Sequence, residues 1–159
     1  MFSRYLTKLM LLLCTVATTL TVSAQINTDR MMIVGRNALY FEDYVLSIQY
    51  FNQVVNAKPY MYEPYFYRAV AKLSLEDYIG AEEDCNKSIE RNPFVVDCYQ
   101  IRGLSLIYQG KYDKAIADYY KGLSMDPENK TLRHNLVLCL IVFIVHLDYC
   151  PEYVIGAFY

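Results

Sequence analysis

The chain has 159 residues, and its 15 basic and 17 acidic side chains give a formal net charge of −2. No basic stripe runs along the sequence, so the charge pattern argues against a nucleic-acid-binding protein. The sequence also has no glycine-rich phosphate loop, no nucleophile motif and no acid–base pair at a meaningful spacing, so we expect neither enzyme activity nor a cofactor.

Residues 1–24 have the three parts of a secretory signal peptide. Basic residues come first without an acidic one, residues 9–22 form an apolar run, and small residues lead to Ala24. Cleavage after Ala24 would leave residues 25–27 as a short leader and, by removing Arg4 and Lys8, take the net charge from −2 to −4. We therefore expect an exported protein, periplasmic or secreted. The alternative is an uncleaved signal that anchors the chain, although about 14 apolar residues are short for a full membrane span.

Residues 28–129 contain a sequence repeat with a period of 34 residues. Sliding the chain by this period aligns small residues, tyrosines and prolines in three copies. The aligned sets are Gly35, Ala69 and Gly103; Tyr44, Tyr78 and Tyr112; Ser47, Ala81 and Ala115; Phe51, Cys85 and Tyr119; and Pro59, Pro93 and Pro127.

Each copy is predicted to be a helical hairpin. In the third copy, apolar residues recur at three- and four-residue spacing from Val96 to Gln109, and again from Tyr112 to Leu123. Gly110 and Lys111 interrupt the two helical patterns, and Pro127 ends the second one because proline lacks the amide hydrogen. Small residues such as Gly103 and Ala115 are expected where the two helices cross.

A 34-residue hairpin with these residues resembles the tetratricopeptide repeat family. The copies run over residues 28–61, 62–95 and 96–129, and a partial fourth copy takes up residues 130–159. The match is strong in the third copy and weaker at the front of the first, where Met31 and Ala38 replace aromatic residues. The resemblance implies an all-α fold, a right-handed superhelical solenoid of helix-turn-helix repeats with a concave groove lined by the first helix of each pair.

The partial fourth copy departs from the repeat pattern. Leu136 to Val145 are ten uninterrupted apolar residues, and the pattern fails at residues 144–146, where a loop and a tyrosine should come. Repeat arrays normally end on a polar capping helix, and about ten apolar residues are too few to span a bilayer. Three interpretations stay open: a helix buried on the third hairpin, a surface covered by an obligate partner, or a chain broken off from a longer array. The apolar helix is also a candidate for self-association.

The cysteine, acidic and histidine residues of the sequence are the remaining candidates for chemical sites. Cys85, Cys98, Cys139 and Cys150 show no metal-binding spacing, and Cys85 takes the packing position of Phe51 and Tyr119. A buried free thiol is therefore favoured for Cys85, with a disulfide to Cys98 left open. We interpret Glu82-Glu83-Asp84 as a solvated helix face, since consecutive helical residues point in different directions. His134 and His146 are over three helical turns apart, too far to share a metal.

The resemblance also implies which residues face the groove. They are Met32, Arg36, Leu39 and Tyr40 in the first copy, Phe66, Tyr67, Val70 and Leu73 in the second, and Gln100, Ile101, Leu104, Ile107 and Tyr108 in the third. Family members that clamp the terminal carboxylate of chaperones carry lysines, asparagines and an arginine at these sites, whereas this chain has Met32, Phe66 and Gln100 where the clamp residues would begin. We therefore expect a partner of apolar or aromatic character rather than an acidic tail, with Phe66, Tyr67 and Tyr108 as anchors.

Two functions follow from this interpretation. The first is a non-enzymatic scaffold or adaptor in a cell envelope, favoured as bacterial, which binds a peptide or protein segment through the groove. The alternative is a structural subunit of a larger repeat assembly, in which the groove and the C-terminal helix are permanently buried.

Overall fold

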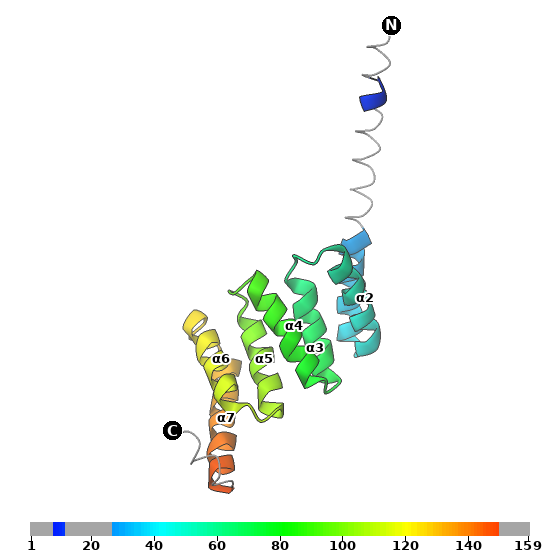
Figure 1. Ribbon diagram of the computed structural model, residues 1–159. Coiled ribbons are helices and arrows are strands. Elements are labelled where there is room, and N and C mark those ends of the chain that lie inside the picture. Colours follow the sequence, from blue (N-terminus) through cyan, green and yellow to red (C-terminus); the bar gives the residue numbers. More distant parts are fainter. Residues whose placement is uncertain (1–7, 12–26, 150–159) are drawn as a thin grey trace. The chain divides into compact units, whose positions relative to one another are not determined.

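The computed structural model describes residues 8–11 and 27–149 of the chain, and all regular structure in these ranges is helical (Figure 1). Most of the predicted signal peptide, and residues 150–159, lie outside the described residues. Among the helices that are described, none combines the length and the apolar character needed to cross a membrane. The chain divides into two compact units, Met1–Pro59 and Tyr60–Tyr159.

The first unit contains one helical hairpin. Residues 27–40 form its first helix, and α2 (Tyr44–Ala57) forms its second. The Asp43 carboxylate caps α2 by accepting a hydrogen bond from the Leu46 amide at 3.1 Å. Phe51 is completely buried, and its ring lies so close to Gly35 that a Cβ atom built there would be 2.9 Å from Cε1.

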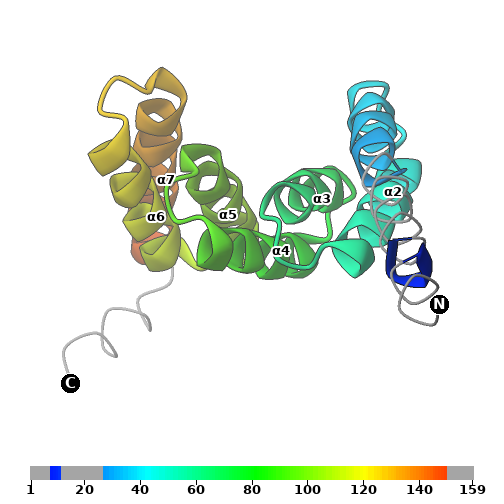
Figure 2. The same ribbon diagram turned by 90° about the horizontal axis from the view of Figure 1, so that it is seen from above.

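The second unit contains two helical hairpins and a final single helix. The hairpins are α3 (Glu63–Ser74) with α4 (Tyr78–Arg91) and α5 (Val96–Tyr108) with α6 (Tyr112–Met125), and α7 (Lys130–Tyr149) follows. Each helix packs on the next, and α3 also contacts α5, as α5 contacts α7. Figure 2 shows α3 and α5 on one side of α4. The predicted all-α fold of helix-turn-helix repeats is confirmed.

The turn inside each hairpin uses the left-handed backbone region at the same repeat position. Glu42, Glu76 and Gly110 have φ angles of 63°, 62° and 73°. Glycine adopts this region without a steric penalty, whereas a residue with a Cβ atom is strained there. The third hairpin therefore has the residue that its turn requires, and the first two carry glutamates in a less favourable conformation.

The connection between hairpins is set by proline. Lys58, Asn92 and Asp126 end the second helices, and each stands directly before a proline. Proline clashes with a helical conformation of the residue before it and has no amide hydrogen to continue the helix. The three prolines that align in the sequence therefore have one role, which is to stop the second helix.

The last helix, α7, continues beyond the point where the repeat predicts a turn. Ile144 is the residue that aligns with Gly110, and a β-branched side chain disfavours the positive φ angle that the turn needs. As a result α7 runs on to Tyr149. It buries Leu132, Leu136 and Cys139 but leaves a second face exposed, formed by Val137, Leu138, Ile141, Val142, Ile144 and Val145. The interpretation of a helix buried on the third hairpin is thus correct for one face only.

A first prediction concerns the turn residues. We expect Gly110→Ala to lower the free energy of unfolding by about 1 kcal/mol, because alanine is strained at this φ angle. Glu76→Gly should raise it by up to about 1 kcal/mol, because relief of strain exceeds the entropic cost of glycine. Urea unfolding followed by circular dichroism measures both changes.

The control for this prediction is Glu83→Gly, the same substitution at an exposed position inside α4. It should destabilise the fold by about 1 kcal/mol, since glycine is a poor helix former. If Glu76→Gly were as destabilising as Glu83→Gly, the positive φ angle at Glu76 would carry no strain.

Candidate functional site

The predicted groove residues of the first unit lie on its first helix. Met32 and Leu39 are half-buried there, while Arg36 and Tyr40 are exposed. Tyr40 is 81% exposed, and its ring meets the Phe41 ring edge-on with centroids 5.2 Å apart. Tyr40 and Phe41 therefore form an exposed aromatic pair within the first unit.

The predicted groove residues of α3 form a second aromatic pair. Phe66 and Tyr67 are half-buried, and their tilted rings have centroids 5.1 Å apart. Val70 and Leu73 follow on the same helix and are also half-buried. The side chains therefore remain accessible in part, as residues of a binding surface must.

An apolar groove lies between α5 and α7. It has a volume of about 230 Å³ and is lined by Leu104, Ile107 and Tyr108 of α5, Tyr119 of α6, and Asn135, Leu138, Cys139 and Val142 of α7. Of the residues predicted to face a groove, Leu104, Ile107 and Tyr108 are brought together here. Gln100 and Ile101 are half-buried on α5 but are not among its lining residues. On the α7 side, Leu138, Cys139 and Val142 belong to the apolar run that the sequence marked as a packed or partner-covered helix, but no sequence signal assigned them to a groove with α5.

The floor of the groove is Tyr119, which reaches it from α6. The hydroxyl end of its ring crosses α5 at Gly103, where a Cβ atom would lie 2.7 Å from Cε1 and 2.9 Å from Cζ. The side chain is completely buried, and its hydroxyl has no hydrogen-bond partner among the described residues. Burial raises the pKa of Tyr119, so the hydroxyl stays protonated and can donate a hydrogen bond.

The rim of the groove is Tyr108, whose orientation is fixed by the preceding hairpin. Its ring stacks on the Tyr78 ring at a centroid distance of 4.6 Å and an interplanar angle of 12°, although the side chain is 59% exposed. The neighbouring Gln109 amide donates to the Tyr78 carbonyl at 3.2 Å and to the Glu82 carboxylate at 2.9 Å. An exposed aromatic ring is therefore held in place beside an apolar groove.

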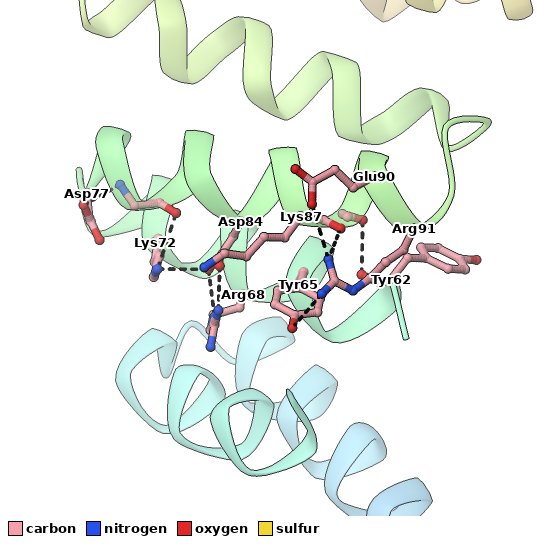
Figure 3. A network of polar contacts seen from close by, with 11 residues as sticks. Tyr62, Tyr65, Arg68, Lys72, Asp77, Asp84, Lys87, Glu90 and Arg91 are labelled. Carbon is pink, nitrogen blue, oxygen red and sulfur yellow. Dashed lines mark hydrogen bonds and ion pairs between the residues drawn. The ribbon is translucent and has the colours of Figure 1, made fainter. Parts of the chain in front are cut away.

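A buried ion-pair network joins α3 to α4 (Figure 3). The Asp84 carboxylate accepts hydrogen bonds from Arg68 Nε at 2.7 Å and Nη2 at 2.5 Å, and Lys72 Nζ lies 2.9 Å from it. Asp84 has no exposed surface. The interpretation of Glu82-Glu83-Asp84 as a solvated face is wrong for Asp84, because α4 turns this residue toward α3.

The next hairpin repeats this pair. Arg102 donates from Nε and Nη2 to the Asp118 carboxylate at 2.8 and 2.6 Å, and from Nη1 to the Asn86 side chain of α4 at 2.7 Å. The hydrogen bonds to Asp118 raise the pKa of Arg102. The 34-residue shift aligns Arg68 with Arg102 and Asp84 with Asp118, and this is the sequence signal that could have revealed the pairs. Every lysine and arginine of α3 and α5 is therefore engaged with a carboxylate.

Comparison with known proteins identifies the fold. Residues 96–129 match the tetratricopeptide repeat family, and a comparison with curated proteins finds no match. The Arabidopsis OM64 TPR domain is similar in structure, with a TM-score of 0.69 and 24% sequence identity over 70% of this chain and 93% of that one. The chain has the tetratricopeptide-repeat fold.

Two further structures with this fold contain bound peptides. The first TPR of Spaghetti (RPAP3), bound to the HSP90 peptide SRMEEVD, has a TM-score of 0.72 and 23% identity over 74% of this chain and 94% of that one. The second TPR domain of human RPAP3, in complex with the HSP70 peptide SGPTIEEVD, has a TM-score of 0.70 and 22% identity over 73% of this chain and 97% of that one. At such identities the likeness concerns the fold alone.

In the part of the chain that the structure describes, the cysteines are packing residues. Cys85, Cys98 and Cys139 are free and buried. Burial raises the pKa of Cys98 to about 11 and that of Cys85 well above its ordinary value, so both thiols are protonated at neutral pH and react poorly. In the part of the chain that the structure describes, no group of three histidine, cysteine or acidic residues is arranged to hold a metal ion.

A second prediction tests the buried network. We expect Asp84→Asn to lower the free energy of unfolding by about 3 kcal/mol, because it removes the buried negative charge that is paired with Arg68 and Lys72. Urea unfolding measures the change. The matched control is Glu83→Gln, an exposed neighbour on α4, which should change stability by less than about 0.5 kcal/mol. Equal effects would show that the Asp84 charge is not required.

Proposed function

We propose that the chain is a non-enzymatic scaffold or adaptor that binds a peptide or protein segment through the groove between α5 and α7. The observation that supports this function is the combination of an apolar groove with an exposed aromatic ring at its rim, held by stacking on Tyr78. Apolar pockets with a few polar groups are the usual form of a binding site. Similar structures with this fold hold peptides.

The chemistry of the groove favours an apolar or aromatic ligand. None of its lining residues carries a formal charge, and the lysines and arginines of α3 and α5 are paired with Asp84 and Asp118. The peptides in the similar structures end in the acidic sequence EEVD. An acidic tail would need cations, and those of α3 and α5 are already engaged inside the hairpins. We therefore propose a segment with aliphatic or aromatic anchors instead.

The site of action that we propose is the cell envelope, periplasmic or secreted. Residues 1–24 carry the pattern of a secretory signal, and we propose residues 28–61, 62–95 and 96–129 as the three repeats of the exported chain. Mass spectrometry of the protein purified from its natural host tests this. An N-terminus at Gln25 would support export, whereas an intact Met1 would contradict cleavage.

A third prediction tests the groove and its ligand. Peptides selected from a random displayed library should carry aliphatic or aromatic anchors, and Val142→Glu on the groove wall should weaken their binding at least about tenfold. Fluorescence anisotropy measures the affinities. Phe94→Glu is the control, because Phe94 is 79% exposed and does not line the groove. Equal affinities of the two variants would contradict the proposal that the peptides bind in the groove. Saturable binding of SRMEEVD would contradict the proposal that the ligand is apolar.

The alternative function, a structural subunit, is favoured by one observation. The exposed face of α7 carries six aliphatic side chains, each between 42% and 57% exposed, and no charged residue lies among them. A monomer rarely exposes a contiguous apolar patch of more than a few hundred Å² unless the patch is an interaction site. This face can be covered by a second copy of the chain or by another protein of a repeat assembly.

A fourth prediction separates the two functions. Sedimentation of residues 25–159 should show concentration-dependent self-association if the α7 face is a subunit interface, and Ile141→Glu should then yield a monomer. Ile79→Glu is the matched control, because Ile79 is 65% exposed on α4, away from this face. A wild-type monomer at all concentrations would contradict self-association and favour the scaffold.

A further inference from the structure

The hydroxyl of Tyr119 has no structural role in the packing of its hairpin. Phe51 takes the same position in the first copy, and its Cε1 and Cζ atoms press on Gly35 as those of Tyr119 press on Gly103. The ring alone therefore satisfies the packing. The hydroxyl is the one chemical difference between the two side chains, and it is buried without a protein partner among the described residues.

An unpartnered buried hydroxyl is unfavourable in the free protein, since it has lost its hydrogen bonds to water. Tyr119 lines the apolar groove, and the other lining residues with polar side-chain groups are Tyr108 at the exposed rim and Asn135, which is half-buried on α7. None of these groups accepts a hydrogen bond from the Tyr119 hydroxyl, so a molecule that fills the groove can supply the acceptor. That acceptor should be neutral, because no cation lines the groove to stabilise a carboxylate.

We infer that the Tyr119 hydroxyl is a ligand-binding group, which donates a hydrogen bond to a backbone carbonyl of a peptide from another protein. An aliphatic side chain next to that carbonyl fills the groove between Leu104 and Val142. This inference rests on the proposed function and specifies its ligand. A peptide fits this description because it presents an apolar side chain and a neutral acceptor only a few bonds apart.

The test is Tyr119→Phe, compared with Tyr120→Phe, which removes a hydroxyl from an exposed neighbour on the same helix. The probe is N-acetyl-leucine methylamide, which carries one aliphatic side chain between two carbonyls. It is titrated into the full chain while amide signals of α5 and α7 are followed by nuclear magnetic resonance. We expect Tyr119→Phe to weaken binding about three- to tenfold and Tyr120→Phe to leave it unchanged.

A second measurement separates this role from a structural one. Tyr119→Phe should leave the melting temperature unchanged or raise it, because the variant no longer buries an unpartnered hydroxyl. A loss of stability would mean that the hydroxyl already has a partner within the fold, and would overturn the inference.

The binding of the probe also distinguishes the role of the Tyr119 hydroxyl from the proposed function of the groove. If Tyr119→Phe binds the probe as tightly as wild type, the inference fails and the proposed function survives. If the probe moves no signal of α5 or α7 in the wild-type chain, both fail. In the full chain, Val154→Glu with Ile155→Glu should leave the affinity unchanged. Tighter binding of the probe by that variant would mean that residues 154 and 155 of the same chain occupy the groove. It would contradict the inference that the ligand is a peptide from another protein.

Discussion

The close approach of the two helices in each hairpin is the constraint on which the rest of the structure depends. It is achieved by a complementary pair of residues, one large and one small. Where the second helix contributes Phe51 or Tyr119, the first helix has Gly35 or Gly103, and where it contributes the smaller Cys85, the first helix has Ala69. A close-packed core tolerates neither a void nor an extra methylene. This pairing carries the Tyr119 ring across α5, and so it also places the floor of the groove.

The same constraint explains why the array changes character at α7. The repeat places Val137 where the earlier hairpins have glycine or alanine, Ile144 where a turn residue is needed, and Leu136 where Arg102 forms its ion pair. Val137 leaves no space for a large residue of a following helix, and Ile144 disfavours a turn. The helix therefore continues, packs by one face on the third hairpin and leaves the other exposed. Three substitutions at repeat positions thus convert a hairpin helix into an apolar surface.

The sequence alone predicted the hairpins well because the period of 34 residues marks both turns and prolines, which act locally. The family resemblance implied a groove at Gln100, Ile101, Leu104, Ile107 and Tyr108, and the last three of these line the groove between α5 and α7. It did not predict the burial of Asp84, because a run of three acids has the local pattern of a solvated helix face. The Arg68–Asp84 pair spans two helices, and only its recurrence as Arg102–Asp118 marks it in the sequence. The role of Tyr119 depends on the space between three helices, which no local pattern encodes.

These ion pairs also support the proposal of an apolar ligand. Arg68, Lys72 and Arg102 project from the helices that would otherwise offer positive charge to a ligand, but each is directed to an aspartate of its own hairpin. Removing one partner of a buried pair is costly, so a ligand carboxylate cannot easily compete for these cations. The electrostatics inside the hairpins therefore leave α5 with an apolar binding face. Asp84 and Asp118 on the second helices thus support the proposed ligand chemistry, because they engage the cations of the first helices α3 and α5.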